Sequence, residues 1–125
     1  MSNLKRFPIK YIRDYIKKDY KTREDCYICS SKTKLELHPL YSVSELFGKW
    51  CDRNSIKEVT SVEKIKELRV IFAKDCEDDL SHKNLFTLCS KHHKQLHTLY
   101  GQTYSNHLAP KIKNWLDIQR MKNGR

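Results

Sequence analysis

NLFTLCSKHHKQLH, residues 84–97, is the stretch that decides the fold, because a short apolar segment leads directly into a histidine-rich helix. The apolar run at 85–88 has the length and composition of a strand. Ser90 is a candidate N-cap for a helix over 91–100, and Gly101 is a residue type that commonly ends helices. The sequence therefore predicts a strand followed at once by a helix.

The predicted helix carries histidines on two of its faces. His92 and His93 are adjacent, so their side chains point about 100° apart. His97 lies four residues after His93 and shares its face, and two imidazoles at this spacing make a good ligand pair for a divalent metal. A third ligand has to come from another element, and the candidate is His38 in the alternating segment LELH (residues 35–38), which predicts a short strand. The alternative is that these histidines are solvated surface groups.

Two pairs of residues have the spacing of a tetrahedral zinc site. They are Cys26-x-x-Cys29, in a polar segment, and Cys89-x-x-His92, at the start of the predicted helix. Zinc is held by four thiolate or imidazole ligands, and residues i and i+3 of a helix point to the same side. The alternatives are a redox dithiol, which would need a thioredoxin-like βαβ context that is absent, and a buried apolar role for Cys89. We expect one structural zinc here.

Outward from these motifs the chain reads as one α+β domain that is mostly helical. The patterns Ser42-x-x-Glu45 and Thr60-x-x-Glu63 are capping boxes that predict two further helices, and Pro110 suits the first turn of a last helix. The predicted parts are a basic N-terminal helix (1–25), a core with the zinc knuckle (26–40 and 84–101), a helical insertion (41–83) and a basic C-terminal helix (102–125).

The net charge of +10 is concentrated at the two ends of the chain. Residues 1–25 carry eight Lys or Arg against four Asp or Glu, and residues 91–125 carry seven against one, whereas residues 26–90 balance at ten and ten. A basic surface attracts phosphate backbones without reading sequence; the alternative is plain solubility. We expect a nucleic acid as partner, contacted by Lys10, Arg13, Lys17, Lys18, Lys111 and Lys113.

The cysteine count and the start of the chain point to a reducing compartment. MSNLKRFPIK has positive charge but no apolar run of signal-peptide length, and no segment is long and apolar enough for a bilayer. Five cysteines, with one CxxC and no secretory signal, favour metal binding over a disulfide framework. Cys51 and Cys76 lack partners at ligand spacing and are expected to be buried thiols. We expect a cytoplasmic protein.

With these motifs the sequence resembles the HNH (His-Asn-His) nuclease superfamily in its zinc-knuckle form. The matching residues are CYIC at 26–29, LELH at 35–38 and NLFTLCSKHHKQLH at 84–97. The resemblance implies the ββα-metal fold, in which two strands and a helix hold one catalytic divalent ion. It also implies an endonuclease that hydrolyses phosphodiester bonds in DNA, with double-stranded DNA as the expected partner, beside a separate structural zinc. The small size suits an enzyme that is encoded by a phage or a mobile element and acts in the cytoplasm of a bacterial host cell.

The resemblance implies a role for each matching residue. His38 looks like the metal ligand of the first strand, and His93 and His97 look like the two helical ligands, with Mg²⁺, Mn²⁺, Ni²⁺ or Zn²⁺ as the ion. Asn84 looks like the asparagine that braces the active-site loop. In such sites the ion polarises the scissile phosphate and stabilises charge on the leaving oxygen.

Pro39 departs from the family pattern. This position usually holds a histidine that deprotonates the attacking water, and proline has no side-chain proton acceptor; general-base catalysis is typically worth ~10²–10⁴-fold. Another group, such as His82 or Tyr41, could substitute, or His38 could shift from ligand to base. In a different interpretation the protein has kept the fold and lost cleavage, and acts by binding DNA or by modulating a host protein. A weaker alternative is a zinc module without a second metal.

Overall fold

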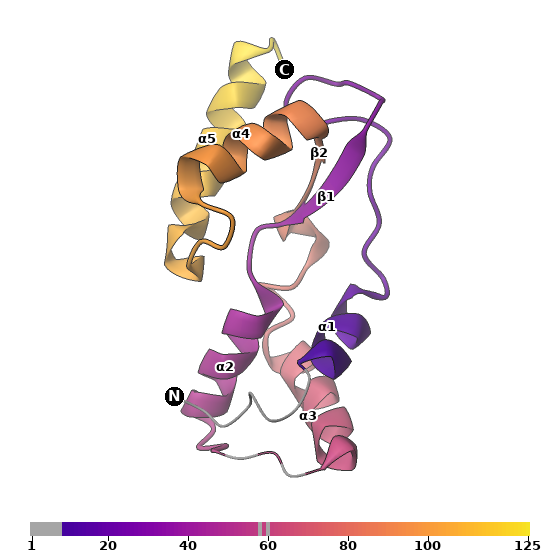
Figure 1. The fold of residues 1–125 in the computed structure, drawn as a ribbon, viewed down its shortest axis with the longest axis vertical. Coiled ribbons are helices and arrows are strands. Elements are labelled where there is room, and N and C mark those ends of the chain that lie inside the picture. Colours follow the sequence, from indigo (N-terminus) through magenta and orange to yellow (C-terminus); the bar gives the residue numbers. More distant parts are fainter. Residues whose placement is uncertain (1–8, 58, 60) are drawn as a thin grey trace. The chain divides into compact units, whose positions relative to one another are not determined.

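The computed structural model describes residues 9–57, 59 and 61–125, which form two compact units. One unit combines the described part of Met1–Tyr20 with Tyr41–Ser81, and the other combines Lys21–Leu40 with His82–Arg125. The colours of Figure 1 show that each unit is assembled from segments far apart in the sequence. The prediction of an α+β, mostly helical chain is confirmed.

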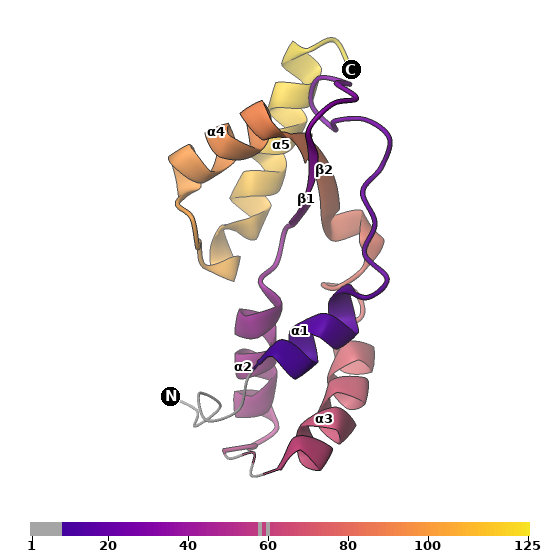
Figure 2. The ribbon, with the colours of Figure 1, turned by 45° about the vertical axis from the view of Figure 1, so that its right-hand side comes forward.

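Three helices form the first unit, α1 (Lys10–Lys17), α2 (Val43–Arg53) and α3 (Val62–Asp75). Helix α1 packs on both α2 and α3 (Figure 2). Each helix has apolar residues three or four positions apart and so buries one face. The aromatic rings of Phe47 and Phe72 meet edge to face with centroids 5.2 Å apart at the centre of this core.

The caps of α2 and α3 use serine hydroxyls. Ser42 Oγ accepts from the backbone N–H of Glu45 at 3.3 Å, as its capping box predicts. At α3 the cap is Ser61, whose Oγ accepts from the N–H of Lys64 at 3.1 Å. Thr60, the predicted cap, lies outside the described residues, and the observed cap is one position later.

The second unit is built around a two-stranded antiparallel sheet. Cα partners across the sheet include Leu35 with Cys89 and His38 with Phe86. The predicted strands and last helices are present. In chain order, the elements of this unit are β1 (Leu35–Pro39), the 3₁₀ helix η2 (His82–Asn84), β2 (Leu85–Cys89), α4 (Ser90–Tyr100), the 3₁₀ helix η3 (Asn106–Leu108) and α5 (Ala109–Lys122).

The junction between β2 and α4 differs from the prediction by one residue. Ser90 is the first helical residue and not the cap; the N-cap is Cys89, whose backbone is extended with φ −70° and ψ 159°. The N–H of Ser90 instead donates to the carbonyl of Lys34 at 2.9 Å, which ties the start of α4 to the residue before β1. Gly101 ends the helix as predicted, with φ 95°.

Two further predictions concern the cysteines outside the metal motifs and the absence of membrane-spanning segments. Cys51 and Cys76 are both buried in the core of the first unit, as expected for thiols without metal partners. None of the helices in the described residues combines the length and the apolar character needed to cross a membrane.

Candidate metal centres

Cys26, Cys29, Cys89 and His92 come together in the second unit and are called here the cysteine site. Their four ligand atoms all lie within 4.8 Å of one another. The sulfurs of Cys29 and Cys89 are 3.8 Å apart, and Cys89 Sγ lies 3.3 Å from His92 Nδ1. Two sulfurs bound at 2.3 Å to one tetrahedral zinc would be separated by about 3.8 Å, so the four side chains fit this ion.

The backbone around Cys26 and Cys29, called here the knuckle, explains how these two residues meet Cys89 and His92. Ser30 N–H donates to the carbonyl of Cys26 at 3.0 Å, with Ser30 in the left-handed region at φ 65°, which closes a tight turn around both thiols. Tyr27 N–H donates to the carbonyl of Thr87 at 2.7 Å. This bond attaches the turn to β2, two residues before Cys89.

The electrostatics of the two knuckle thiols differ. Burial opposes ionisation of Cys26, but hydrogen bonds from the backbone of Cys29, Cys89 and Ile28 outweigh it and lower its pKa. Burial raises the pKa of Cys29. A bound cation would favour the thiolate form of both side chains, because zinc is held by deprotonated cysteine.

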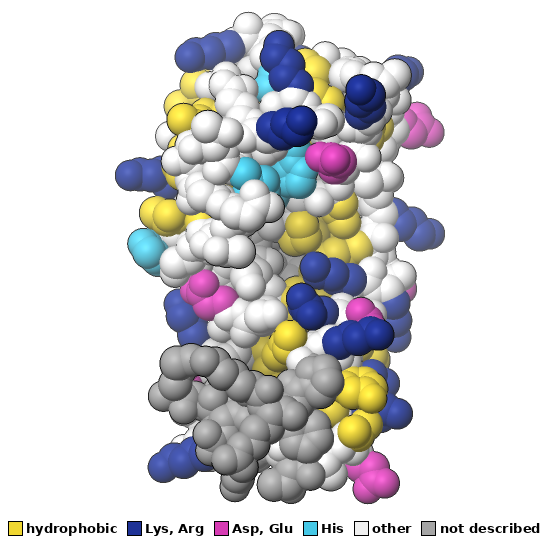
Figure 3. All heavy atoms as spheres, in the orientation of Figure 1, with side chains coloured by type: hydrophobic (Ala, Val, Ile, Leu, Met, Phe, Trp, Pro, Cys, Tyr) yellow, Lys and Arg dark blue, Asp and Glu magenta, His cyan; other side chains and the backbone are white. Residues whose placement is uncertain are grey.

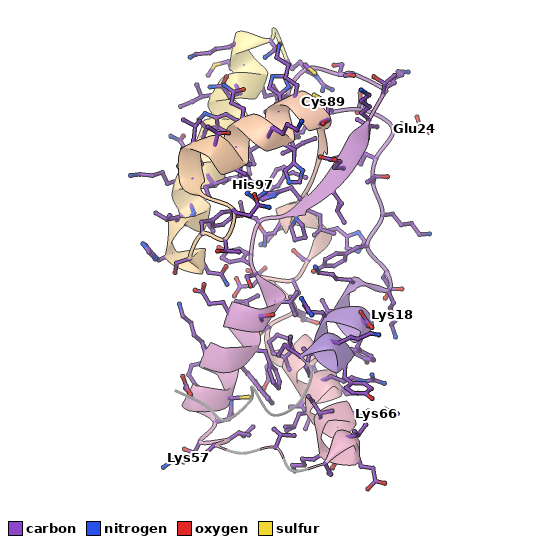
Figure 4. The ribbon with its side chains drawn as sticks, viewed as in Figure 1. Lys18, Glu24, Lys57, Lys66, Cys89 and His97 are labelled. Carbon is purple, nitrogen blue, oxygen red and sulfur yellow. The ribbon has the colours of Figure 1, made fainter. Side chains whose placement is uncertain are left out.

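His38, His93 and His97 form a second cluster, called here the histidine site. His38 Nδ1 lies 3.2 Å from His93 Nε2, which lies 3.1 Å from His97 Nε2. Two nitrogens bound at 2.0–2.1 Å to one tetrahedral ion would be about 3.3 Å apart, so these three nitrogens fit a common ion. Figure 4 shows His97 on the side of α4 that faces β1.

The hydrogen bonds on the outer nitrogens determine which inner nitrogens carry protons. His97 Nδ1 lies 3.0 Å from the carbonyl oxygen of Gly101, and His93 Nδ1 lies 2.8 Å from Glu36 Oε1. A carbonyl or carboxylate oxygen only accepts, so both Nδ1 atoms carry the proton. In the neutral form of each ring the lone pair is therefore on Nε2.

His38 also has a lone pair on the nitrogen that faces the other two histidines, because its other nitrogen is hydrogen-bonded to a tyrosine. Tyr104 Oη lies 2.8 Å from the carbonyl oxygen of Leu40 and 2.7 Å from His38 Nε2. The phenol has one proton and the carbonyl can only accept it, so His38 Nε2–H donates to the tyrosine oxygen. His38 Nδ1 is left with a lone pair. Three lone pairs then converge at about 3 Å, an arrangement that a cation between them would stabilise.

Glu36 and Tyr104 are hydrogen-bond partners of the histidine site that the sequence analysis missed. Glu36 had a usable signal, because it precedes His38 by two positions in a strand and therefore shares its face. Tyr104 had none, since it lies 66 positions from its partner His38 in a segment without a motif. Outer partners of this kind orient metal-bound imidazoles.

A hollow of about 500 Å³ opens beside the histidine site and is called here the histidine hollow. Figure 3 shows histidine side chains reaching the surface next to an acidic side chain. The hollow exposes two of the three imidazole ligands to solvent, and its lining is Glu36, His93, Lys94, His97, Thr98 and Gln102.

Other predicted site residues lie elsewhere. His82 is exposed in η2 and belongs neither to the histidine site nor to the lining of the hollow. Tyr41 packs against the core of the first unit. The carbonyl of Asn84 accepts from the N–H of Leu40 at 2.8 Å, which joins the end of β1 to the start of β2. Among the predicted DNA contacts Lys113 is half-buried, and the exposed ones are Lys10, Arg13, Lys17, Lys18 and Lys111.

Acidification is expected to destabilise the protein through His38. Burial, followed by the charges of His93 and His97, lowers the pKa of His38 from 6.5 to about 3. Between these pH values the unfolded chain binds a proton that the folded chain does not. The contribution to stability is therefore complete above pH 6.5 and is lost as the pH falls towards 3, by up to about 1.4 kcal/mol per pH unit.

This pH effect can be measured by denaturant unfolding of protein that carries zinc only at the cysteine site. The His38→Gln variant lacks the titrating group, so its free energy of unfolding should depend less steeply on pH than that of the unaltered protein. Equal pH dependence in both proteins would contradict the prediction.

Comparison with known families identifies a match that spans nearly the whole chain. A family model named after the nicking endonuclease of phage T5, and described as "Nicking endonuclease family", matches residues 1–124. The matched range includes all seven side chains of the cysteine and histidine sites. No solved structure matches the chain.

Proposed function

The chain belongs to the nicking endonuclease family, and we propose that it is an HNH-type enzyme that cleaves DNA with a divalent metal held by His38, His93 and His97. The family supports a DNA endonuclease. The observation that carries the finer proposal is the convergence of three imidazole nitrogens, with His93 Nε2 3.2 Å from His38 Nδ1 and 3.1 Å from His97 Nε2. The succession β1, β2 and α4 is the arrangement that a ββα-metal core requires.

Each residue of the proposed centre has a separate task. His38, His93 and His97 would hold the ion, and Glu36 and Tyr104 keep two of the imidazoles in the tautomer that presents a lone pair. When bound, the ion would polarise the scissile phosphate and stabilise charge on the leaving oxygen.

The histidine hollow is the proposed place of the scissile phosphate. It exposes His93 and His97, and Lys94 adds a positive charge to its lining. Such a cation attracts the phosphate group and favours the more highly charged transition state. Mg²⁺, Mn²⁺, Ni²⁺ and Zn²⁺ are the ions to test.

The cysteine site has a structural role in this proposal. It would hold zinc through three thiolates and one imidazole, a ligand set with no position left for substrate. Because Cys89 and His92 begin α4, this zinc would hold the helix that carries His93 and His97 in place against β1.

Pro39 bears on how the attacking water loses its proton. His38 is poorly suited to act as base, since Nε2–H is engaged by Tyr104 and Nδ1 faces the other two imidazoles. His82 remains a candidate base, although it is exposed and outside the ligand cluster. Alternatively, hydroxide from solvent attacks without a side-chain base, at a slower rate.

The proposal is tested by incubating the protein with supercoiled plasmid and each divalent metal in turn. We expect open circles from the unaltered chain, and an increase of up to about 10²–10⁴-fold in Pro39→His if a base is missing. The second candidate function is a DNA-binding protein that has lost cleavage, and the observation that favours it is Pro39 at the usual position of the general base. Nicking by the Pro39→His variant but not by the unaltered chain would support it. Absence of nicking in both proteins with every metal would contradict the enzyme.

A further inference from the structure

A second hollow of about 380 Å³ lies in the second unit and is called here the basic hollow. It shares no lining residue with the histidine hollow. Its walls come from the loop before the knuckle, from η2 and β2, and from α5 and the residues after it. Five of its lining residues are cations, namely Arg23, Lys83, Lys113, Arg120 and Arg125.

Tyr27 organises the cations of this hollow. Arg120 Nη1 donates to the carbonyl oxygen of Tyr27 at 2.8 Å, and its guanidinium lies 4.4 Å from the centroid of the Tyr27 ring. Arg125 Nη1 donates to the same carbonyl at 3.2 Å. Lys113 Nζ lies 5.9 Å from the ring of Tyr27 and 5.6 Å from that of Phe86. Three of the five cations, Arg120, Arg125 and Lys113, are thus held in place, and each guanidinium has five N–H donors, more than these contacts use.

The carboxylates nearby do not balance these cations. Asp25 pairs with Arg125 at 3.5 Å, and Asp117 pairs with Lys113 at 2.6 Å while it accepts from the phenol of Tyr27. Without counting Lys83, the other four cations of the hollow still outnumber these two carboxylates, Asp25 and Asp117. Gathering like charges opposes folding, so this arrangement is better explained by an anion that binds there than by stability.

We propose that the basic hollow binds a backbone phosphate of the DNA substrate, at a position other than the scissile phosphate. This inference rests on the proposed function. Phosphodiester oxygens accept hydrogen bonds, and the planar fork of arginine matches them with two parallel donors. A contact of this kind fixes the position of the DNA on the protein without reading its sequence.

Binding of a fluorescent DNA duplex over a range of salt concentrations tests this site. The measurements use the zinc-containing full chain without added divalent metal, so that cleavage does not interfere. The variants are Arg23→Gln, Arg120→Gln and their combination. Lys32→Gln is the matched control, because Lys32 is an exposed cation of the same unit that does not line the hollow. Zinc content and melting temperature verify the fold of each variant.

Each single variant should reduce the slope of log affinity against log salt by about 1, and the double variant by about 2, whereas Lys32→Gln leaves it unchanged. An unchanged slope in the double variant, with tight binding by the unaltered chain, would overturn the inference and leave the proposed function intact. Absence of DNA binding by the unaltered chain would overturn both.

A further experiment distinguishes binding of DNA from binding of a free anion at the basic hollow. Inorganic phosphate, added at constant ionic strength, should compete for the duplex no better than chloride does. If phosphate raises the melting temperature of the unaltered chain but not of Arg120→Gln, while DNA binding is equal in both, the hollow binds free phosphate and the inference is overturned.

Discussion

Replacing His93 by alanine is expected to abolish nicking while the protein remains folded. His93 Nε2 is the nitrogen that both other ligands approach, at 3.2 Å from His38 Nδ1 and 3.1 Å from His97 Nε2. Its removal leaves two ligands for the proposed ion. Loss of one transition-state donor costs about 10²–10³-fold, and loss of a catalytic ion should cost at least that much. The measurement is the rate of plasmid nicking, together with metal content, which should fall from two ions per chain to one.

His107→Ala is the matched control for this variant. His107 is an exposed histidine of η3 outside both metal clusters, so the same chemical change should leave nicking and metal content unaltered. Glu36→Gln should give an intermediate result of about 10–100-fold, because the amide oxygen still accepts from His93 Nδ1–H but carries no charge. Full nicking by His93→Ala would contradict the assignment of the histidine site.

Replacing Cys89 by serine should have the largest effect on stability. Cys89 is the cysteine-site residue at the junction of β2 and α4, and its loss separates the knuckle from the helix. Structural zinc contributes about 10–16 kcal/mol of folding free energy in small zinc-finger peptides. We therefore expect the second unit to unfold, with loss of one zinc per chain and of nicking, as measured by calorimetry and metal analysis.

Cys51→Ser makes the same chemical change in the first unit and serves as the control. Burial, and then the charge of Asp52, raises the pKa of Cys51 to about 11, so this thiol stays protonated. Burying a hydroxyl in its place should cost about 1–3 kcal/mol without any loss of zinc. If Cys89→Ser were no more destabilising than Cys51→Ser, the structural role of the cysteine site would be wrong.

Among the candidate sites, the ligand pairs close in sequence were the most predictable. Cys26 with Cys29 and His93 with His97 are brought together by a single turn of chain, so spacing alone indicates that each pair can share an ion. The cap at Ser42 was predicted for the same reason, because capping joins residues three positions apart. At α4 the same local reasoning was one residue off, since the N-cap is Cys89 and Ser90 is the first residue of the helix.

By itself, then, the sequence determined the helices and strands, the separate ligand pairs and the basic ends, since these follow from residue types within about four positions of one another. Only the tertiary structure decided that Tyr104 and Glu36 set the protonation of the imidazoles, and that cations from three segments converge around Tyr27. The physical reason is distance along the chain. Glu36 and Tyr104 lie 57 and 66 positions from their histidines, and Arg120 lies 93 positions from Tyr27. No local geometry relates such residues until the sheet and α5 have packed.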